Sequence, residues 1–181
     1  MSKHRLKAVR SVADIPRSLR KTPFGELLMY HNMNVPFRKY EAARIIVCMC
    51  MDNRKQLRLP DNFAYKLRTG GGNVRHSEFK VSYAIGIGGV KHVAMIAHDN
   101  CGMSGLIDRR AGFIKGMAKN AGWTEKRASE YFAAYAPLFE IGDEVEFVVA
   151  EARRLNQKYP KVKVLPMFYK LEDNRLYLIG K

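Results

Sequence analysis

Short apolar runs alternate along this chain with segments whose apolar residues recur at helical spacing. Four runs of apolar, largely β-branched or aromatic character predict strands at residues 44–50, 62–68, 92–97 and 163–169. The first of them, Arg-Ile-Ile-Val-Cys-Met-Cys, is typical of a parallel strand that is buried on both faces. Residues 175–179, which follow a polar turn, indicate an additional strand at the edge of the sheet.

Helices are predicted between these strands. Apolar residues on one helical face predict a helix over 143–158, and residues 24–30 indicate a shorter one. Thr124 is a good N-cap for a helix that we expect Pro137 to end. The pattern over 77–88 fits either a strand or a helix, and we expect a helix because parallel strands need a crossover connection.

This alternation predicts an α/β fold with a mainly parallel four-stranded sheet flanked by helices and a possible extra C-terminal edge strand. The length of 181 residues suits one domain, which we place at residues 41–181. Residues 1–40 form a basic arm that three prolines interrupt. Because the arm has few apolar periods, we expect it to lie on another surface, and a partner subunit is the candidate.

The positive charge of the chain bears on which partners it could bind. The net charge is +15, and residues 1–40 carry nine Lys or Arg but only two acidic residues. Such an excess can attract nucleic acid or anionic membranes. However, basic residues interleaved with aromatic ones, a mark of nucleic-acid binding, do not occur here. We therefore favour a solvated basic surface that helps to collect a small anion, and expect neither nucleic acid nor a membrane as partner.

The sequence contains only three cysteines, Cys48, Cys50 and Cys101. A small, odd number of cysteines argues against a disulfide scaffold. No run of 18 apolar residues that could span a bilayer occurs, and no apolar stretch follows the charged start as in a secretory signal. Free thiols suit a reducing compartment, so we expect a cytoplasmic protein.

Chemically active residues follow three of the predicted strands. Cys50 ends the first strand, Arg68 and the glycine run 70–72 end the second, and His98 and Cys101 follow the third. In parallel sheets, ligands bind beyond the carboxyl ends of the strands. These residues, which are distant in the sequence, should therefore meet at one edge of the sheet.

Two thiolates and one imidazole are typical zinc ligands, and three protein ligands leave a fourth position open to water, as in catalytic sites. Each residue alone has a simpler explanation: His98 could be a hydrogen-bonded structural residue and Cys50 a packed thiol. Together they favour a zinc site made by Cys50, His98 and Cys101. Cys48 shares the strand face of Cys50, but we expect it to lie deeper, as a core thiol.

At this point the chain resembles a known family. Over residues 42–110, three motifs resemble the β-class carbonic anhydrases in kind and order, and the short length resembles the compact branch of that family. The motifs are Cys50-x-Asp52-x-Arg54, Arg68 with Gly71-Gly72, and His98-x-x-Cys101-Gly102. The resemblance implies Zn²⁺ as cofactor, with water or hydroxide as its fourth ligand. It also implies reversible hydration of CO2 to bicarbonate by zinc-bound hydroxide, in a homodimer or higher homo-oligomer.

The resemblance further implies that Asp52 pairs with Arg54 and accepts a hydrogen bond from the zinc-bound water or hydroxide. A physical reason supports this, since a free carboxylate beside the ion could take its fourth position and a bidentate guanidinium would prevent that. An ordinary ion pair is the alternative. For Gly70, Gly71 and Gly72, either their backbone approaches the site closely, with Arg68 as a brace, or they form a plain turn that needs positive φ.

The chain departs from the family pattern beside these residues. Asn53 stands where Ser or Ala is usual, and Thr69-Gly70 and Asp99-Asn100 also differ from the pattern. Lys55-Gln56 replaces the apolar residue that often follows the motif arginine. Asp99 either adds negative charge near the metal or caps the following turn.

Other functions fit parts of the pattern. A related zinc hydrolase of carbonyl sulfide or carbon disulfide could use the same scaffold, and pocket width would decide between these substrates. A non-catalytic zinc-stabilised module that binds RNA is a more distant alternative. A thiol enzyme with Cys50 as nucleophile is disfavoured, because Cys50 and Arg54 lack the spacing of a Cys-x₅-Arg phosphate loop.

Overall fold

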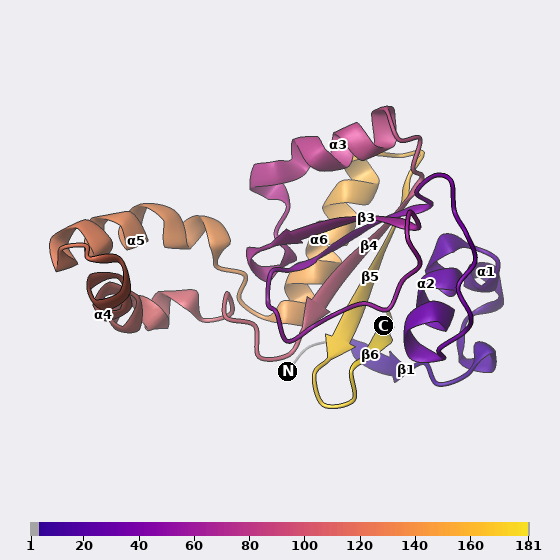
Figure 1. The fold of residues 1–181 in the computed structure, drawn as a ribbon, viewed down its shortest axis with the longest axis horizontal. Helices are drawn as coiled ribbons and strands as arrows, with labels where there is room; N and C mark the ends of the chain where they lie inside the picture. Colours follow the sequence, from indigo (N-terminus) through magenta and orange to yellow (C-terminus); the bar gives the residue numbers. More distant parts are fainter. Residues whose placement is uncertain (1–3, 181) are drawn as a thin grey trace.

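The computed structural model describes residues 4–180. They form three layers, with one six-stranded sheet between two layers of helices (Figure 1). The strand order is β1-β6-β5-β4-β2-β3. Strands β2 to β5 run parallel, β6 is antiparallel to β5, and β1 is antiparallel to β6. The strands are β1 (Arg5–Ala8), β2 (Ile45–Cys50), β3 (Ala64–Thr69), β4 (His92–His98), β5 (Lys163–Lys170) and β6 (Arg175–Gly180).

Helices cover both faces of the sheet. The α2 helix packs on one face, and α3 and α6 pack on the other (Figure 1). The α-helices are α1 (Arg17–Arg20), α2 (Pro23–Asn32), α3 (Glu78–Gly86), α4 (Arg110–Ala121), α5 (Glu125–Phe139) and α6 (Glu144–Lys158). Short 3-10 turns occur at Val12–Asp14, Gly70–Gly72, Arg75–Ser77 and Leu106–Arg109.

Alternation along β2 explains why the sheet is covered on both sides. All six residues of this strand are buried. Val47 and Met49 point into the core beneath α2, whereas Ile46 and Cys48 point into the core beneath α3 and α6. Burial on both faces is what a continuous apolar strand requires, so the expected four parallel strands with flanking helices are confirmed.

Two expectations were wrong: that the last strand lies at the edge of the sheet, and that Pro137 ends the helix before it. The strand at 175–180 is not an edge strand, because β1 pairs with its free side through the register Arg5↔Gly180 to Ala8↔Tyr177. Pro137 does not end the preceding helix, which continues to Phe139. A proline in the last turn removes only one backbone hydrogen bond, so the helix can continue past it for two residues.

The basic arm packs on the sheet of its own chain. Besides β1, it contributes α2, whose Phe24, Leu27 and Leu28 are almost fully buried in the core. The buried Asn32 amide fastens this segment: its Nδ2 donates to the carbonyl oxygens of Val9 and Leu176, both at 2.8 Å, and its Oδ1 accepts from the Leu176 N–H at 2.9 Å. That the arm also contacts a partner subunit stays a prediction.

A helical hairpin, α4 with α5, extends away from the sheet (Figure 1). Its two helices pack on each other through Phe113 and Phe132. Several large apolar side chains of the hairpin and its stem remain exposed, namely Ile107, Tyr131, Tyr135 and Leu138. Within residues 4–180, no helix is both long enough and apolar enough to cross a membrane.

We expect Asn32→Ala to lower the free energy of unfolding by about 3 kcal/mol, since it leaves buried backbone groups of β6 and of the arm without partners. Urea denaturation with an unchanged m-value would measure this. Asn120→Ala, which removes an exposed asparagine from α4, is the matched control and should change stability little. A loss below about 0.5 kcal/mol for Asn32→Ala would show that the arm is held mainly by other contacts.

Candidate metal centre

The three predicted ligands meet where β2 and β4 end side by side. Cys50 is the last residue of β2, His98 is the last of β4, and Cys101 lies in the loop after β4. Parallel pairing of β2 with β4 brings these ends together. The sulfur atoms of Cys50 and Cys101 are 3.9 Å apart, and the ligand atoms of all three residues lie within 4.8 Å of one another. All three side chains are buried.

The ring of His98 is oriented for a metal ion. Its Nδ1 lies 2.7 Å from the carbonyl oxygen of Asp99. Because a carbonyl can only accept, Nδ1 must carry the hydrogen and Nε2 must present its lone pair. Nε2 is buried and has no hydrogen-bond partner among the described residues. A buried acceptor beside two thiols suits one tetrahedral cation, so these residues fit a metal ion.

The two candidate ligand thiols, Cys50 and Cys101, change each other's pKa. The contact with Cys101 lowers the pKa of Cys50 to about 3, and the same contact raises the pKa of Cys101. One sulfur of the pair is therefore ionised at neutral pH while the other holds a proton, which a bound cation would displace. Cys48 differs, because burial raises its pKa to about 12. It lies fully buried in the core beneath α3 and α6, outside the ligand group.

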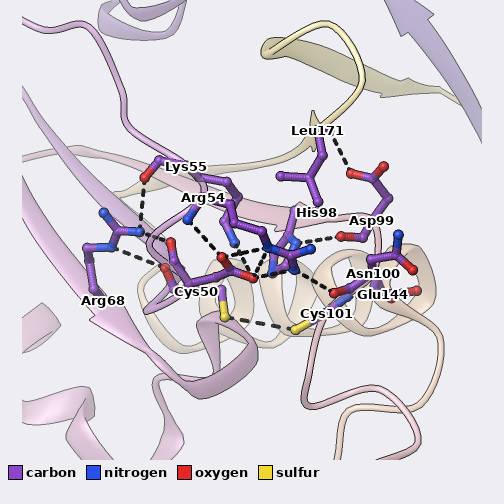
Figure 2. A network of polar contacts seen from close by, with 11 residues as sticks. Cys50, Arg54, Lys55, Arg68, His98, Asp99, Asn100, Cys101, Glu144 and Leu171 are labelled. Atoms are coloured by element: carbon purple, nitrogen blue, oxygen red, sulfur yellow. Dashed lines mark hydrogen bonds and ion pairs between the residues drawn. The ribbon is translucent and has the colours of Figure 1, made fainter.

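Asp52 is fixed by Arg54, which lies beside these ligands in Figure 2. The Arg54 backbone N–H and Nε donate to Oδ1 at 2.9 and 3.0 Å, and Nη2 donates to Oδ2. Nη2 also donates to the carbonyl oxygen of Asn100, at 2.9 Å, in the loop that leads to Cys101. The hydrogen bonds from Arg54 hold the pKa of Asp52 well below its usual range, so this carboxyl is ionised at neutral pH.

Arg68 holds the loop that carries Asp52. From β3, its Nε donates to the carbonyl oxygen of Cys50 at 3.2 Å, and its Nη2 donates to the carbonyl oxygens of Asp52 and Lys55 (Figure 2). One side chain thus collects three carbonyls of the loop at 50–55. These contacts place the guanidinium against the loop backbone, the position expected of a brace.

The glycine run forms the turn that was one of the two roles considered for it, and a direct role in the site stays a prediction. Gly71 and Gly72 have φ of 62° and 72°, a region that favours glycine. A side chain at Gly71 would also collide with Ile141, whose Cγ2 would lie 2.8 Å from its Cβ. The run therefore forms a turn and packs closely at the same time.

Three polar residues near the site were missed or left open by the sequence. Asp99 turns its carboxylate to the Leu171 N–H at 2.8 Å, so it fixes the turn between β5 and β6. Glu144, at the start of α6, accepts from the Cys101 N–H at 3.3 Å. Lys55 is buried, and its Nζ lies 3.7 Å from Oδ2 of Asp52. Asp99 and Lys55 stood out in the sequence as departures from the pattern of the family that the chain resembles, whereas Glu144 carried no signal.

An apolar pocket of about 280 Å³ adjoins the metal centre. Its walls come mainly from the hairpin, with Phe113, Tyr131 and Phe132 among them. Met51 and Met103 line both this pocket and the cleft that contains Cys50 and Asp52. A small apolar molecule held in the pocket would therefore be one side chain away from the candidate ligands.

No family model and no curated protein matches the sequence. Solved structures do match the fold. A β-carbonic anhydrase from Trichomonas vaginalis aligns with a TM-score of 0.61 at 14% identity, covering 92% of this chain and 99% of that one. A carbonic anhydrase from Streptococcus mutans aligns at 0.58 and 15% identity, covering 84% and 92%. A carbon disulfide hydrolase aligns at 0.52 and 19% identity, covering 75% and 78%. The chain therefore has the β-carbonic anhydrase fold that the resemblance implied.

We expect Cys50→Ser and Cys101→Ser to lose bound zinc, because a serine hydroxyl does not ionise at neutral pH as a thiolate ligand does. Cys48→Ser is the matched control, with the same substitution two residues away, and should keep one zinc per chain. Elemental analysis of purified protein measures all three, and circular dichroism checks that each is folded. Zinc retained by folded Cys50→Ser, or lost from folded Cys48→Ser, would contradict this ligand set.

Proposed function

We propose that this protein is a zinc-dependent carbonic anhydrase that hydrates CO2 reversibly to bicarbonate. The observation that carries the proposal is the buried Nε2 of His98, which faces two thiols and finds no other partner among residues 4–180. A donor set of two sulfurs and one nitrogen with an open fourth position is typical of zinc. The shared fold supports this reading without fixing the substrate.

The chemistry divides between the ion and the chain. When bound, zinc with three protein ligands lowers the pKa of a water molecule on its fourth position towards neutrality and so supplies a nucleophile. Asp52 lines the same cleft as Cys50 and is ionised. It can therefore accept a hydrogen bond from the attacking water and orient it, while Arg54 keeps the carboxylate from turning onto the ion.

Other residues would keep this arrangement in place. Arg68 holds the backbone of the 50–55 loop, so Asp52 cannot shift without breaking contacts to three carbonyls. The hydrogen bond from His98 Nδ1 to Asp99 fixes the ring with Nε2 towards the thiols. Met51 and Met103 lie between the apolar pocket and the cleft, so an uncharged linear substrate could pass between the two along apolar side chains.

Carbon disulfide or carbonyl sulfide hydrolysis is the second candidate. It is favoured by the apolar character of the adjoining pocket and by the likeness to a carbon disulfide hydrolase. Both reactions begin with attack on the carbon of a linear triatomic molecule. Rates measured with CO2 and with carbonyl sulfide distinguish the two candidate reactions.

Zinc-loaded protein should hydrate CO2 well above the uncatalysed rate in a stopped-flow assay with a pH indicator. Carbonyl sulfide hydrolysis should be measured on the same sample, together with its zinc content. A larger kcat/KM for carbonyl sulfide would favour the second candidate. A fully zinc-loaded sample that is inactive towards both would refute the proposed function.

Asp52→Ala serves as the mechanistic control in that assay. We expect it to retain zinc, because Asp52 is not among the three ligands, while kcat falls about 100-fold through loss of an oriented acceptor. An Asp52→Ala protein with full activity would show that the carboxylate plays no part in the reaction.

We also propose that the protein forms a homodimer or larger homo-oligomer, as the resemblance implied. The projecting hairpin supports this, since Tyr131, Tyr135 and Leu138 are each more than 40% exposed. Light scattering at micromolar concentration should give at least twice the chain mass of 20.7 kDa. A monomer under these conditions would contradict the assembly.

A further inference from the structure

Lys55 is the least expected residue near the metal centre. Its side chain is only 1% exposed, although lysine is almost never fully buried unless it is paired. Its Nζ finds no hydrogen-bond acceptor in the part of the chain that the structure describes. The nearest carboxylate oxygen, Oδ2 of Asp52, is 3.7 Å away, which is an ion pair but too long for a hydrogen bond. A cation buried at this cost needs an explanation.

The loop backbone brings Lys55 to this place. Arg68 holds the carbonyl oxygens of both Asp52 and Lys55, so the segment that joins them is fixed at its two ends. Figure 2 shows Lys55 beside Arg54 and Cys50, above the two sulfurs. Burial is the largest effect on this ammonium and lowers the pKa of Lys55, whereas Cys50 and Asp52 favour its charged form.

Arg54 and Lys55 hold the same carboxylate in different environments. The Arg54 side chain is 50% exposed, so water and salt weaken its attraction to Asp52. Lys55 is shielded from solvent, and its attraction to Oδ2 acts through a medium of lower dielectric constant. The buried cation therefore contributes a hold on Asp52 that ionic strength affects little.

We propose that Lys55 is a positioning residue that, together with Arg54, holds Asp52 away from the fourth coordination position of the metal. The proposal rests on the proposed function only in assuming that the ligand group binds a divalent ion. Asp52 is two residues from Cys50 and lines the same cleft, so it is the carboxylate best placed to close the site. With Lys55 in place, that position stays available to water and to small anions.

Stability offers a first test. Lys55→Met removes the cost of burying an ammonium that has no hydrogen bond, and Asp52 keeps its hydrogen bonds from Arg54, so the change should be neutral or stabilising. The melting temperature of metal-free Lys55→Met should be no lower than that of the wild type. A clear decrease would mean that Lys55 is a structural residue, and would overturn the proposal.

The decisive experiment measures access to the metal without turnover. Protein loaded with Co²⁺ has visible absorption bands that change when azide, a small linear anion, binds to the ion. If Asp52 occupies the fourth position in nine-tenths of Lys55→Met molecules, the apparent azide dissociation constant rises about tenfold. Lys55→Gln, neutral but polar, should behave alike and guards against a folding defect specific to methionine. Lys66→Met removes the same charge from an exposed site on β3 and should bind azide like the wild type.

A double variant separates positioning from direct attraction of the anion. In Lys55→Met/Asp52→Asn, the amide is a poor ligand, so azide affinity should return to that of Asp52→Asn alone. If the double variant stayed as weak as Lys55→Met, the lysine would act on the anion itself and the proposal would fail. It would also fail if Lys55→Met bound azide normally, or if the folded variant no longer bound Co²⁺.

These outcomes are independent of the proposed reaction. CO2 hydration by the zinc-loaded wild type is measured in parallel. Azide binding that depends on Lys55 in a protein without hydration activity would refute the proposed function alone. If the wild type hydrates CO2 but Lys55→Met binds azide as tightly as the wild type does, this inference alone would be refuted.

Discussion

The parallel pairing of β2 with β4 is the constraint on which the metal centre depends. These two strands, with the loop after β4, carry all three ligand atoms. A strand rises about 3.3 Å per residue and its side chains alternate between faces, so a slip of one residue would move Cys50 out of reach of His98 and turn it to the other side. The register is fixed by apolar side chains on both faces of the sheet. The hydrophobic core thus sets the geometry of a polar site.

The loop at 51–55 shows a different kind of control. It contains Asp52, Arg54 and Lys55, and Asp52 accepts a hydrogen bond from the Arg54 backbone N–H within it. From outside, Arg68 reaches across from β3 and donates to the carbonyl oxygens of Cys50, Asp52 and Lys55. Charge beside the ligands is therefore placed by a strand that supplies no ligand. Positioning from outside the ligand group is common at metal sites, where it tunes the chemistry as strongly as the ligands do.

Periodicity and strand ends were enough to predict the four parallel strands, the crossover helix α3, and the meeting of Cys50, His98 and Cys101 at one edge. These features depend on local pattern and on general rules of sheet topology. The strand β1 could not be predicted, because four residues of alternating exposure carry little signal and their pairing partner lies about 170 residues away. Lys55 stands where an apolar residue is usual, but this signal could not predict its burial, since burial of a charge is decided by its tertiary neighbours.

The pairing of Arg5 with Gly180 also has a practical consequence. The first and last described strands, β1 and β6, lie next to each other at the outer side of the sheet. By the usual strand spacing, β1 is four strand positions, or about 19 Å, from β2. A short linker could therefore join the two ends, and new termini could be opened in a surface loop to give a circular permutant. Tags or fusion partners attached beyond β1 and β6 would sit together on one flank of the sheet.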